Sequence, residues 1–196
     1  MSAGDEIRFA VDALRRLPWP VARFVVRARS LARQDRDVFS LDSALRPAKL
    51  AVLLDAAAGR RTVVELGTGT AWATIALAIA DPERTIESWD PVARPQRERY
   101  LDLAGADVRP RITFVEGLGE DGPGAVSGVD LLFIDSSHER EPTLAEVATW
   151  RPVLAPGALV VFDDYGHPDY PGVAEAVAEL GAAGEARASL FLWPLV

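Results

Sequence analysis

The sequence contains no cysteine. This absence excludes a disulfide framework, thiolate ligands for a metal ion and a cysteine nucleophile. The chain also has no dense block of lysine and arginine, and its formal net charge is −8. A phosphate backbone would be repelled by such a surface, so nucleic acid is not an expected partner. A small organic molecule is the better candidate substrate.

Long hydrophobic segments are missing as well. The first residues, 1–6, lack a basic region followed by an apolar run, so they do not resemble a secretory signal. No stretch reaches the roughly 18 uncharged apolar residues typical of a membrane span. We therefore expect no membrane partner and a cytoplasmic location.

The 196 residues, 49% of them hydrophobic, suffice for one substantial core but not for two ordinary enzyme domains. We predict a single domain, 1–196, in which residues 1–46 form a helical cap and residues 47–196 form the core. Apolar positions recur at helical spacing at Ile7, Val11 and Leu14. A further helix is predicted from Pro47 through Ala58.

From residue 62 onward, short β-rich apolar runs alternate with helical patterns. This alternation predicts an α/β fold with a doubly wound, mostly parallel sheet and helices on both faces. The last segment, 190–196, has no helix after it and is predicted to be a strand at an edge of the sheet, where Pro194 is tolerated. The predicted strands are 62–66, 85–89, 112–115, 129–134 and 158–162; the predicted helices between and after them are 72–80, 94–104, 144–154 and 173–180.

A glycine turn, residues 67–70, follows the first of these strands. Small residues there let a ligand approach the backbone and the start of the next helix, although a tight connection without a ligand has the same pattern. A dinucleotide fingerprint would need a third glycine where Trp72 stands. Asp90 ends the second strand and suits the ribose of either cofactor class. Glu65 favours a cationic sulfonium over an anionic pyrophosphate.

Together, Glu65 to Gly69 and Asp90 resemble the first motif and second-strand acid of class I S-adenosylmethionine-dependent methyltransferases. The resemblance covers about residue 47 to the C-terminus and is nearest to small O-methyltransferases of the catechol, caffeoyl-coenzyme A and macrolide-sugar types. It implies a Rossmann-like fold whose C-terminal edge strand is antiparallel. Ala71 and Ala73 depart from the family's usual Gly and Ser, the latter a contact of the methionine carboxylate. The implied cofactor-binding residues are Glu65, Gly67, Thr68, Gly69, Asp90, Gly117, Leu118 and Asp135.

Three acids stand at the ends of two later strands: Asp135, Asp163 and Asp164. If those strands lie beside the first, their carboxylates would repel one another unless a cation offsets them. Oxygen ligands suit Mg²⁺ or another oxygen-preferring divalent cation. The resemblance agrees, because metal-dependent relatives place ligands at matching positions. A cap or a solvated carboxylate is the alternative for any one of them.

His138 lies three residues beyond Asp135, within reach of the same site through one turn. A histidine can act as the base that removes a hydroxyl proton, and the macrolide-sugar type has a similar Asp-x-x-His pattern. A surface histidine is the alternative. His167 and Tyr170 are candidates for an acceptor pocket or for a plain loop.

These features predict a methyltransferase that methylates a hydroxyl of a small-molecule acceptor, with metal assistance and His138 as the catalytic base. Two alternatives remain: an NAD(P)-dependent oxidoreductase, and a module that binds S-adenosylmethionine without catalysis. The sequence identifies neither the acceptor nor the oligomeric state, and a homo-oligomer is left open.

Overall fold

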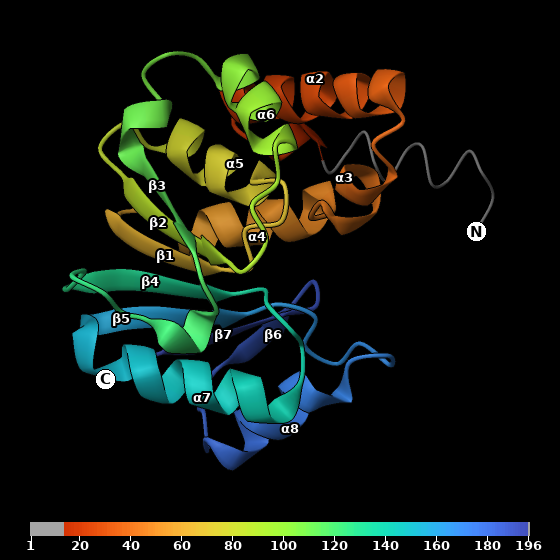
Figure 1. Ribbon diagram of the computed structural model, residues 1–196. Coiled ribbons are helices and arrows are strands. Elements are labelled where there is room, and N and C mark those ends of the chain that lie inside the picture. The colour runs from red at the N-terminus through yellow and green to blue at the C-terminus, as the bar shows by residue number, and fades with distance from the viewer. Residues whose placement is uncertain (1–13, 196) are drawn as a thin grey trace.

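The computed structural model describes residues 14–195, which form a seven-stranded sheet with the order β3-β2-β1-β4-β5-β7-β6 (Figure 1). Strands β1 to β5 are parallel, and β7 and β6 are antiparallel to their neighbours. The predicted sheet is thereby confirmed. The strands are β1 Thr62–Leu66, β2 Thr85–Asp90, β3 Ile112–Glu116, β4 Val129–Ile134, β5 Leu154–Phe162, β6 Glu185–Arg187 and β7 Leu190–Pro194.

Helices cover both faces of this sheet (Figure 1). The first group packs over β1 to β3, and α7 and α8 pack together against the opposite face. None of the helices within residues 14–195 has the length and apolarity needed to cross a bilayer. The helices are α2 Trp19–Asp35, α3 Val38–Ser43, α4 Pro47–Ala56, α5 Trp72–Ala80, α6 Gln96–Ala104, α7 Arg140–Trp150 and α8 Pro171–Glu179, with short 3₁₀ turns at η1 Arg109–Arg111, η2 Gly119–Asp121 and η3 Arg151–Val153.

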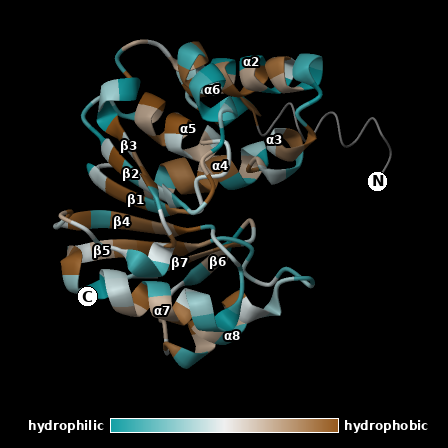
Figure 2. Ribbon diagram, viewed as in Figure 1, coloured by the Kyte–Doolittle hydropathy of each residue, from teal (hydrophilic) through white to brown (hydrophobic). Residues whose placement is uncertain are grey.

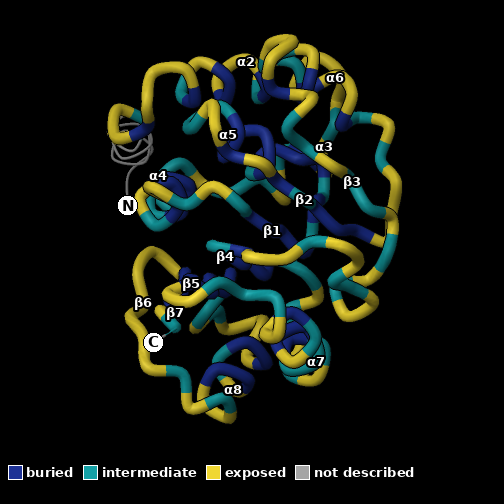
Figure 3. Tube along the Cα trace, turned by 90° about the vertical axis from the view of Figure 1, so that its left-hand side faces the viewer, coloured by how far each residue is buried: buried dark blue, intermediate teal, exposed yellow. Residues whose placement is uncertain are grey.

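Two apolar cores result from the alternation of side chains along the central strands. Val63 of β1 belongs to one core and Val64 to the other, because successive residues of a strand point to opposite faces. Val64 is paired in register with Leu132, and Leu132 with Val160; all three are fully buried. The hydropathy and burial views show this concentration of apolar, buried positions in the central strands (Figures 2 and 3).

The N-terminal part of the described chain is helical, as predicted. Val21, Phe24 and Ala28 of α2 belong to the same core as α5. Helix α4 begins at Pro47 and ends at Ala56, two residues before the predicted end. The predicted helical positions Ile7 and Val11 lie outside the described residues.

Several boundaries in the C-terminal half differ from the prediction. The helix predicted over 144–154 begins at Arg140, and Leu154 is the first residue of β5 rather than the last of a helix. Pro152 explains why the helix ends at Trp150, because proline has no amide hydrogen to continue an α-helix and here lies in the turn η3. The antiparallel strand β7 has one more strand outside it, the three-residue β6, which was not predicted.

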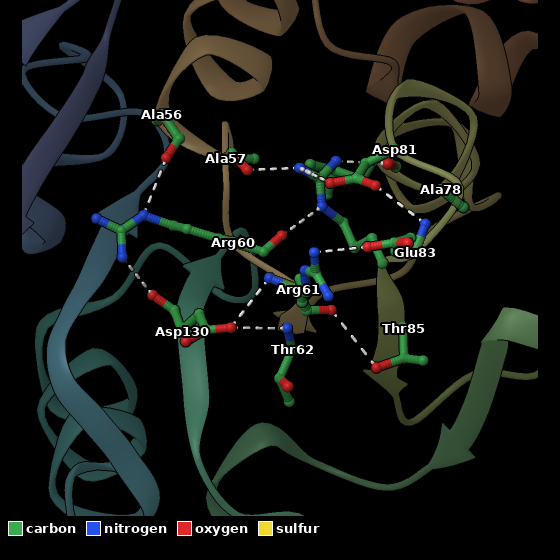
Figure 4. Close-up of polar contacts among 12 residues, drawn as sticks. Ala56, Ala57, Arg60, Arg61, Thr62, Ala78, Asp81, Glu83, Thr85 and Asp130 are labelled. Atoms are coloured by element: carbon green, nitrogen blue, oxygen red, sulfur yellow. Dashed lines mark hydrogen bonds and ion pairs between the residues drawn. The ribbon is translucent and has the colours of Figure 1, made fainter.

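A polar network joins the amino ends of β1 and β4 (Figure 4). The glycine turn follows the opposite, carboxyl end of β1. The Asp130 carboxylate accepts hydrogen bonds from the amides of Arg61 and Thr62, at 2.9 and 3.0 Å. The Arg60 guanidinium donates to the Asp130 carbonyl at 2.8 Å. These bonds hold the two strands in register, so their carboxyl ends are also held side by side.

The strand order reverses between β1 and β4, because β1 pairs with β2 on one side and β4 on the other. In open α/β sheets, ligands bind outside the carboxyl ends of the strands at such a reversal. The fold thus places the ends of β1, β2, β4 and β5 around one candidate site.

Substitution of Gly67 would show how closely the segments after β1 and β4 approach each other. It has φ +99°, and a Cβ atom there would lie 1.9 Å from the Asp135 carbonyl oxygen. Gly59 has φ +73° but no atom within 4 Å of such a Cβ. We expect Gly67→Ala to lower the free energy of unfolding by at least about 3 kcal/mol and Gly59→Ala by about 1 kcal/mol, as measured by denaturant titration. Equal losses would contradict the close approach.

Candidate active site

A cavity of about 1150 Å³ opens at the carboxyl ends of β1, β2, β4 and β5. This volume exceeds that of a typical small-molecule pocket, as a site for a cofactor together with a second small molecule would require. Predicted site residues from four separate strand ends meet in its wall: Glu65, Gly69, Asp90, Asp135, His138 and Asp163.

The glycine turn joins β1 to α5 and contacts the end of β2. The amides of Gly67 and Thr68 both donate to the Trp89 carbonyl, at 2.8 and 3.1 Å. Gly67 is needed for its contact with Asp135, whereas a Cβ at Gly69 would meet no atom closer than the Phe39 ring at 3.9 Å. Gly69 is therefore the position where the turn leaves room for a ligand.

The second-strand acid, Asp90, is held by three donors. Its Oδ2 accepts a hydrogen bond from the Gly69 amide at 2.7 Å, and its Oδ1 accepts one from the Val92 amide at 2.7 Å. The buried Arg97 guanidinium lies 3.2 Å from Oδ2 and donates to the carbonyls of Gly69 and Val92. A carboxylate has about four acceptor sites, so the oriented Asp90 retains capacity for a ribose hydroxyl.

Glu65 lines the cavity but is only 1% exposed. Its carboxylate accepts hydrogen bonds from the hydroxyls of Thr74 and Ser88. Burial raises the pKa of Glu65 to about 7, even though both hydroxyls lower it. The Thr74 hydroxyl is engaged by Glu65 and does not line the cavity, whereas Thr70 does, which makes Thr70 the candidate for the methionine end of a cofactor.

The loop after β3 forms another wall of the cavity. Leu118 lines it and is 48% exposed. The predicted Gly117 is not among the lining residues, and a Cβ there would be 3.3 Å from the Trp89 ring. Glu146 of α7, not predicted as a site residue, also reaches the cavity and accepts a hydrogen bond from the Ser136 hydroxyl at 2.8 Å. Burial raises the pKa of Glu146 to about 7. Its sequence context is that of any helical glutamate, so no signal identified it.

The three predicted acids, Asp135, Asp163 and Asp164, all line the cavity, and a cation lies against two of them. The Lys49 ammonium, from the first turn of α4, donates to Asp164 Oδ1 at 2.7 Å and lies 2.7 Å from Asp163 Oδ1. Burial alone would lower the pKa of Lys49, but Asp163 and Asp164 raise it above its ordinary value. Lys49 was not predicted, although it is the only lysine in the sequence.

This arrangement does not fit the predicted divalent ion as it stands. Within the described residues, no group of three or more His, Cys, Asp or Glu side chains is arranged to hold a metal. The ammonium of Lys49 takes up the space between Asp163 and Asp164 instead. Asp135 remains beside them, and burial together with Asp163 raises its pKa well above the ordinary range.

His138 is brought to the same acids, as the spacing predicted. Its Nε2 lies 3.7 Å from Asp135 Oδ1 and 3.8 Å from Asp164 Oδ2. Burial lowers the pKa of His138, against the opposing effect of Asp164 and Asp163. The Tyr170 ring lies between the two histidines, with centroid distances of 4.8 Å to His138 and 4.9 Å to His167.

The backbone around the cavity adopts unusual conformations. Six non-glycine residues of the described chain have positive φ, and four of them line the cavity. Such conformations cost free energy and cluster at functional sites, where the surrounding structure enforces them. The four are His138, Asp164, Ala188 and Ser189.

Sheet order, glycine turn and second-strand acid together define a class I methyltransferase site. A model of the methyltransferase-domain family matches residues 64–165, just over half of the chain. The chain therefore belongs to the class I S-adenosylmethionine-dependent methyltransferases. The search of curated proteins found no match.

Solved structures share this fold at low sequence identity. CalS11, a TDP-rhamnose 3′-O-methyltransferase of calicheamicin biosynthesis, is 19% identical, with a TM-score of 0.59 over 99% of this chain and 95% of its own. A Staphylococcus aureus protein assigned to the caffeoyl-CoA O-methyltransferases is 12% identical, with a TM-score of 0.63 over 86% and 97%. The O-methyltransferase NovP is 18% identical, with a TM-score of 0.54 over 75% and 78%.

The raised pKa of Glu65 predicts a pH-dependent stability. Because the folded carboxyl titrates near 7 and the unfolded one near 4.5, the folded state binds more protons between these values, and stability falls as pH rises through this window. We expect Glu65→Gln to unfold like the parent chain at pH 5 and to be more stable at pH 8, on the order of 3 kcal/mol.

Thermal and denaturant unfolding of the ligand-free protein at both pH values measures this effect. Glu175→Gln, at an exposed position of α8, is the matched control and should show no gain at pH 8. A Glu65→Gln variant no more stable than the parent at pH 8 would mean that the buried carboxyl is not penalised by burial.

Proposed function

We propose that this methyltransferase transfers a methyl group from S-adenosylmethionine to a hydroxyl oxygen of a small molecule. The observation that carries the proposal is that His138 and the Lys49–Asp164 pair line the same cavity as the glycine turn and Asp90. In this proposal His138 is the proton acceptor and Lys49 is the cation that can bind an oxygen, both beside the proposed cofactor site. The O-methyltransferase names of CalS11 and NovP support an oxygen acceptor, and the acidic net charge of −8 supports a small molecule over nucleic acid.

The residues at the strand ends suit the parts of this cofactor. The open side of Gly69 leaves space for it, Asp90 can accept ribose hydroxyl protons, and Leu118 offers an apolar surface for the adenine. Glu65, beneath the turn, faces the part of the site where a cation would be favoured. When bound, S-adenosylmethionine supplies its methyl group as an electrophile: the methyl–oxygen bond forms as the methyl–sulfur bond breaks, and that bond's electron pair stays on sulfur.

His138 is proposed as the base for this transfer. Its lowered pKa keeps the imidazole neutral near pH 7, the form that accepts a proton. The hydroxyl proton passes to Nε2 of His138 as the oxygen is methylated, which balances the charge lost by the sulfonium. His167 and Tyr170, which also line the cavity, are proposed to contact the acceptor.

Magnesium, predicted from the three acids, is given no step in this proposal. Asp163 and Asp164, two of the three predicted ligands, each have an oxygen 2.7 Å from the Lys49 nitrogen. Mg²⁺ would have to coordinate those same oxygens at about 2.0–2.1 Å. The Mg²⁺ prediction therefore stays a prediction.

A nicotinamide cofactor is the alternative that the glycine turn leaves open. Trp72 stands where the dinucleotide fingerprint needs a third glycine, and its ring packs at 5.1 Å from the Tyr100 ring. Its side chain is only 6% exposed and belongs to the apolar core, although part of it lines the cavity, so a pyrophosphate at this position would have to displace a packed residue.

Calorimetric titration separates these cofactors. We expect one molecule of S-adenosylhomocysteine to bind per chain, and no binding of NAD or NADP, because the acidic turn suits a cationic aminoacyl group and not a pyrophosphate. Asp90→Asn should weaken S-adenosylhomocysteine about 10-fold or more, while Glu175→Gln leaves it unchanged. Tight binding of a dinucleotide alone would refute the methyltransferase proposal.

Turnover tests the role of His138. A panel of phenols and sugar-nucleotide hydroxyl compounds is first incubated with S-[methyl-¹⁴C]adenosylmethionine to find an acceptor. With it, His138→Ala should lower kcat about 10²–10⁴-fold because no group then removes the proton. Affinity for S-adenosylhomocysteine should be unchanged, and added imidazole should restore part of the rate in His138→Gly. An unaltered kcat, or no methylated product from any hydroxyl compound, would count against this assignment.

A further inference from the structure

The chain has 21 lysine and arginine residues, and Lys49 is the only lysine among them. It is the third residue of α4, in the first turn of that helix. A cation is electrostatically unfavourable there, because the amino end of a helix carries partial positive charge. The helix itself therefore gives no reason for a lysine at this position, and the reason must come from the groups around it.

Those groups are the acids at the ends of β4 and β5. The Lys49 nitrogen lies 2.7 Å from one oxygen of Asp163 and 2.7 Å from one oxygen of Asp164. The contact with Asp164 is a charge-assisted hydrogen bond, whereas the contact with Asp163 is an ion pair, and Asp163 Oδ1 has no hydrogen-bond partner among the described residues. The side chains of Lys49 and Asp163 are only 14% and 4% exposed, so neither charge is hydrated as it would be at the surface. The pairing therefore takes the place of the hydration that each group would have at the surface.

We infer that Lys49 is the resident cation of this site, in the place that the acid pattern suggested for a divalent metal, and that methyl transfer proceeds with it alone. The single positive charge of the ammonium is shared between Asp163 and Asp164 and offsets one of their two formal negative charges. It has three N–H donors, and two acid oxygens use at most two of them, so at least one remains for another oxygen in the cavity.

That remaining donor gives Lys49 a place in the proposed reaction. A hydrogen bond from the ammonium to the acceptor hydroxyl would orient its oxygen and favour the loss of its proton to His138. This second role rests on the proposed function. The first role, in which Lys49 is the cation paired with Asp163 and Asp164, does not depend on the proposed function.

A lysine and a divalent ion exclude one another at this position. Mg²⁺ coordinated by Asp163 and Asp164 would lie within a few ångströms of the ammonium, and like charges so close in a poorly hydrated cavity repel strongly. Conversely, removal of Lys49 leaves buried carboxylates without a partner, which is costly unless another cation takes its place. Removal of the lysine should thus create the metal site that the parent chain lacks.

Binding of Mn²⁺ alone, followed by electron paramagnetic resonance without cofactor or acceptor, tests this inference. We expect no stoichiometric Mn²⁺ binding to the parent protein, and one ion per chain in Lys49→Ala, bound at least about tenfold more tightly. Arg46→Ala is the matched control: Arg46 precedes the same helix and lines the same cavity, but among the described residues it has no ion pair with Asp163 or Asp164. It should not gain a site.

A second measurement uses the unmodified protein, in case Lys49→Ala does not fold. With lysine-specific ¹⁵N labelling, the chain has a single side-chain ammonium signal, which should be protected from solvent exchange and unchanged by added Mg²⁺. Asp164→Asn should shift it. One Mn²⁺ bound per parent chain, or a lysine signal displaced by Mg²⁺, would overturn the inference. Neither Mn²⁺ binding to the parent chain nor a displaced lysine signal would change the S-adenosylhomocysteine titration. Failure of this inference is therefore distinguishable from failure of the proposed function.

Discussion

The close contact of β1 with β4 is the constraint on which the site depends. Gly67 lies so near the Asp135 carbonyl that a single Cβ would overlap it, and the Asp135 amide donates to the Leu66 carbonyl at 2.8 Å. The contact exists because the strand order reverses between these two strands. It brings a cofactor turn and a chain of acids to one sheet edge, although they are far apart in sequence. The glycine at position 67 is thus required by the fold, and the room for a ligand comes from Gly69.

Charge balance is the second constraint on this edge. Several acids with little access to water share one cavity, and three of them, Glu65, Asp135 and Glu146, have raised pKa values because of burial. The paired acids Asp163 and Asp164 are offset by one ammonium from α4. A helix that precedes the sheet in sequence thereby becomes part of the candidate catalytic centre. The candidate site is therefore formed by residues of α4 as well as by the strand ends and loops of the sheet.

Much of the fold and of the candidate site could be predicted from residue patterns. Buried β-rich runs and the helical spacing between them determined the sheet, and strand-end positions were enough to bring Asp90, Asp135, His138 and Asp163 together. The pattern did not predict β6, whose three exposed residues carry no apolar signal, or the early start of β5, hidden by Pro156 and Gly157. Lys49 was missed because its contact with Asp164, across 115 residues, leaves no trace in local spacing. Glu146 was missed because its sequence context is that of any glutamate on a helix. The lone lysine was the available signal, and acids without a visible partner suggested a metal instead.

The central claim is that an ammonium, not a metal ion, is the cation paired with the acids beside the cofactor. A crystal structure of the protein with S-adenosylhomocysteine, grown in the presence of MnCl₂ and measured at the manganese absorption edge, tests it most directly. The account predicts the cofactor product along the turn at Gly69 and Asp90, the Lys49 nitrogen between Asp163 and Asp164, and no anomalous peak between the acids. A manganese peak coordinated by Asp135, Asp163 and Asp164, with Lys49 turned away, would contradict it.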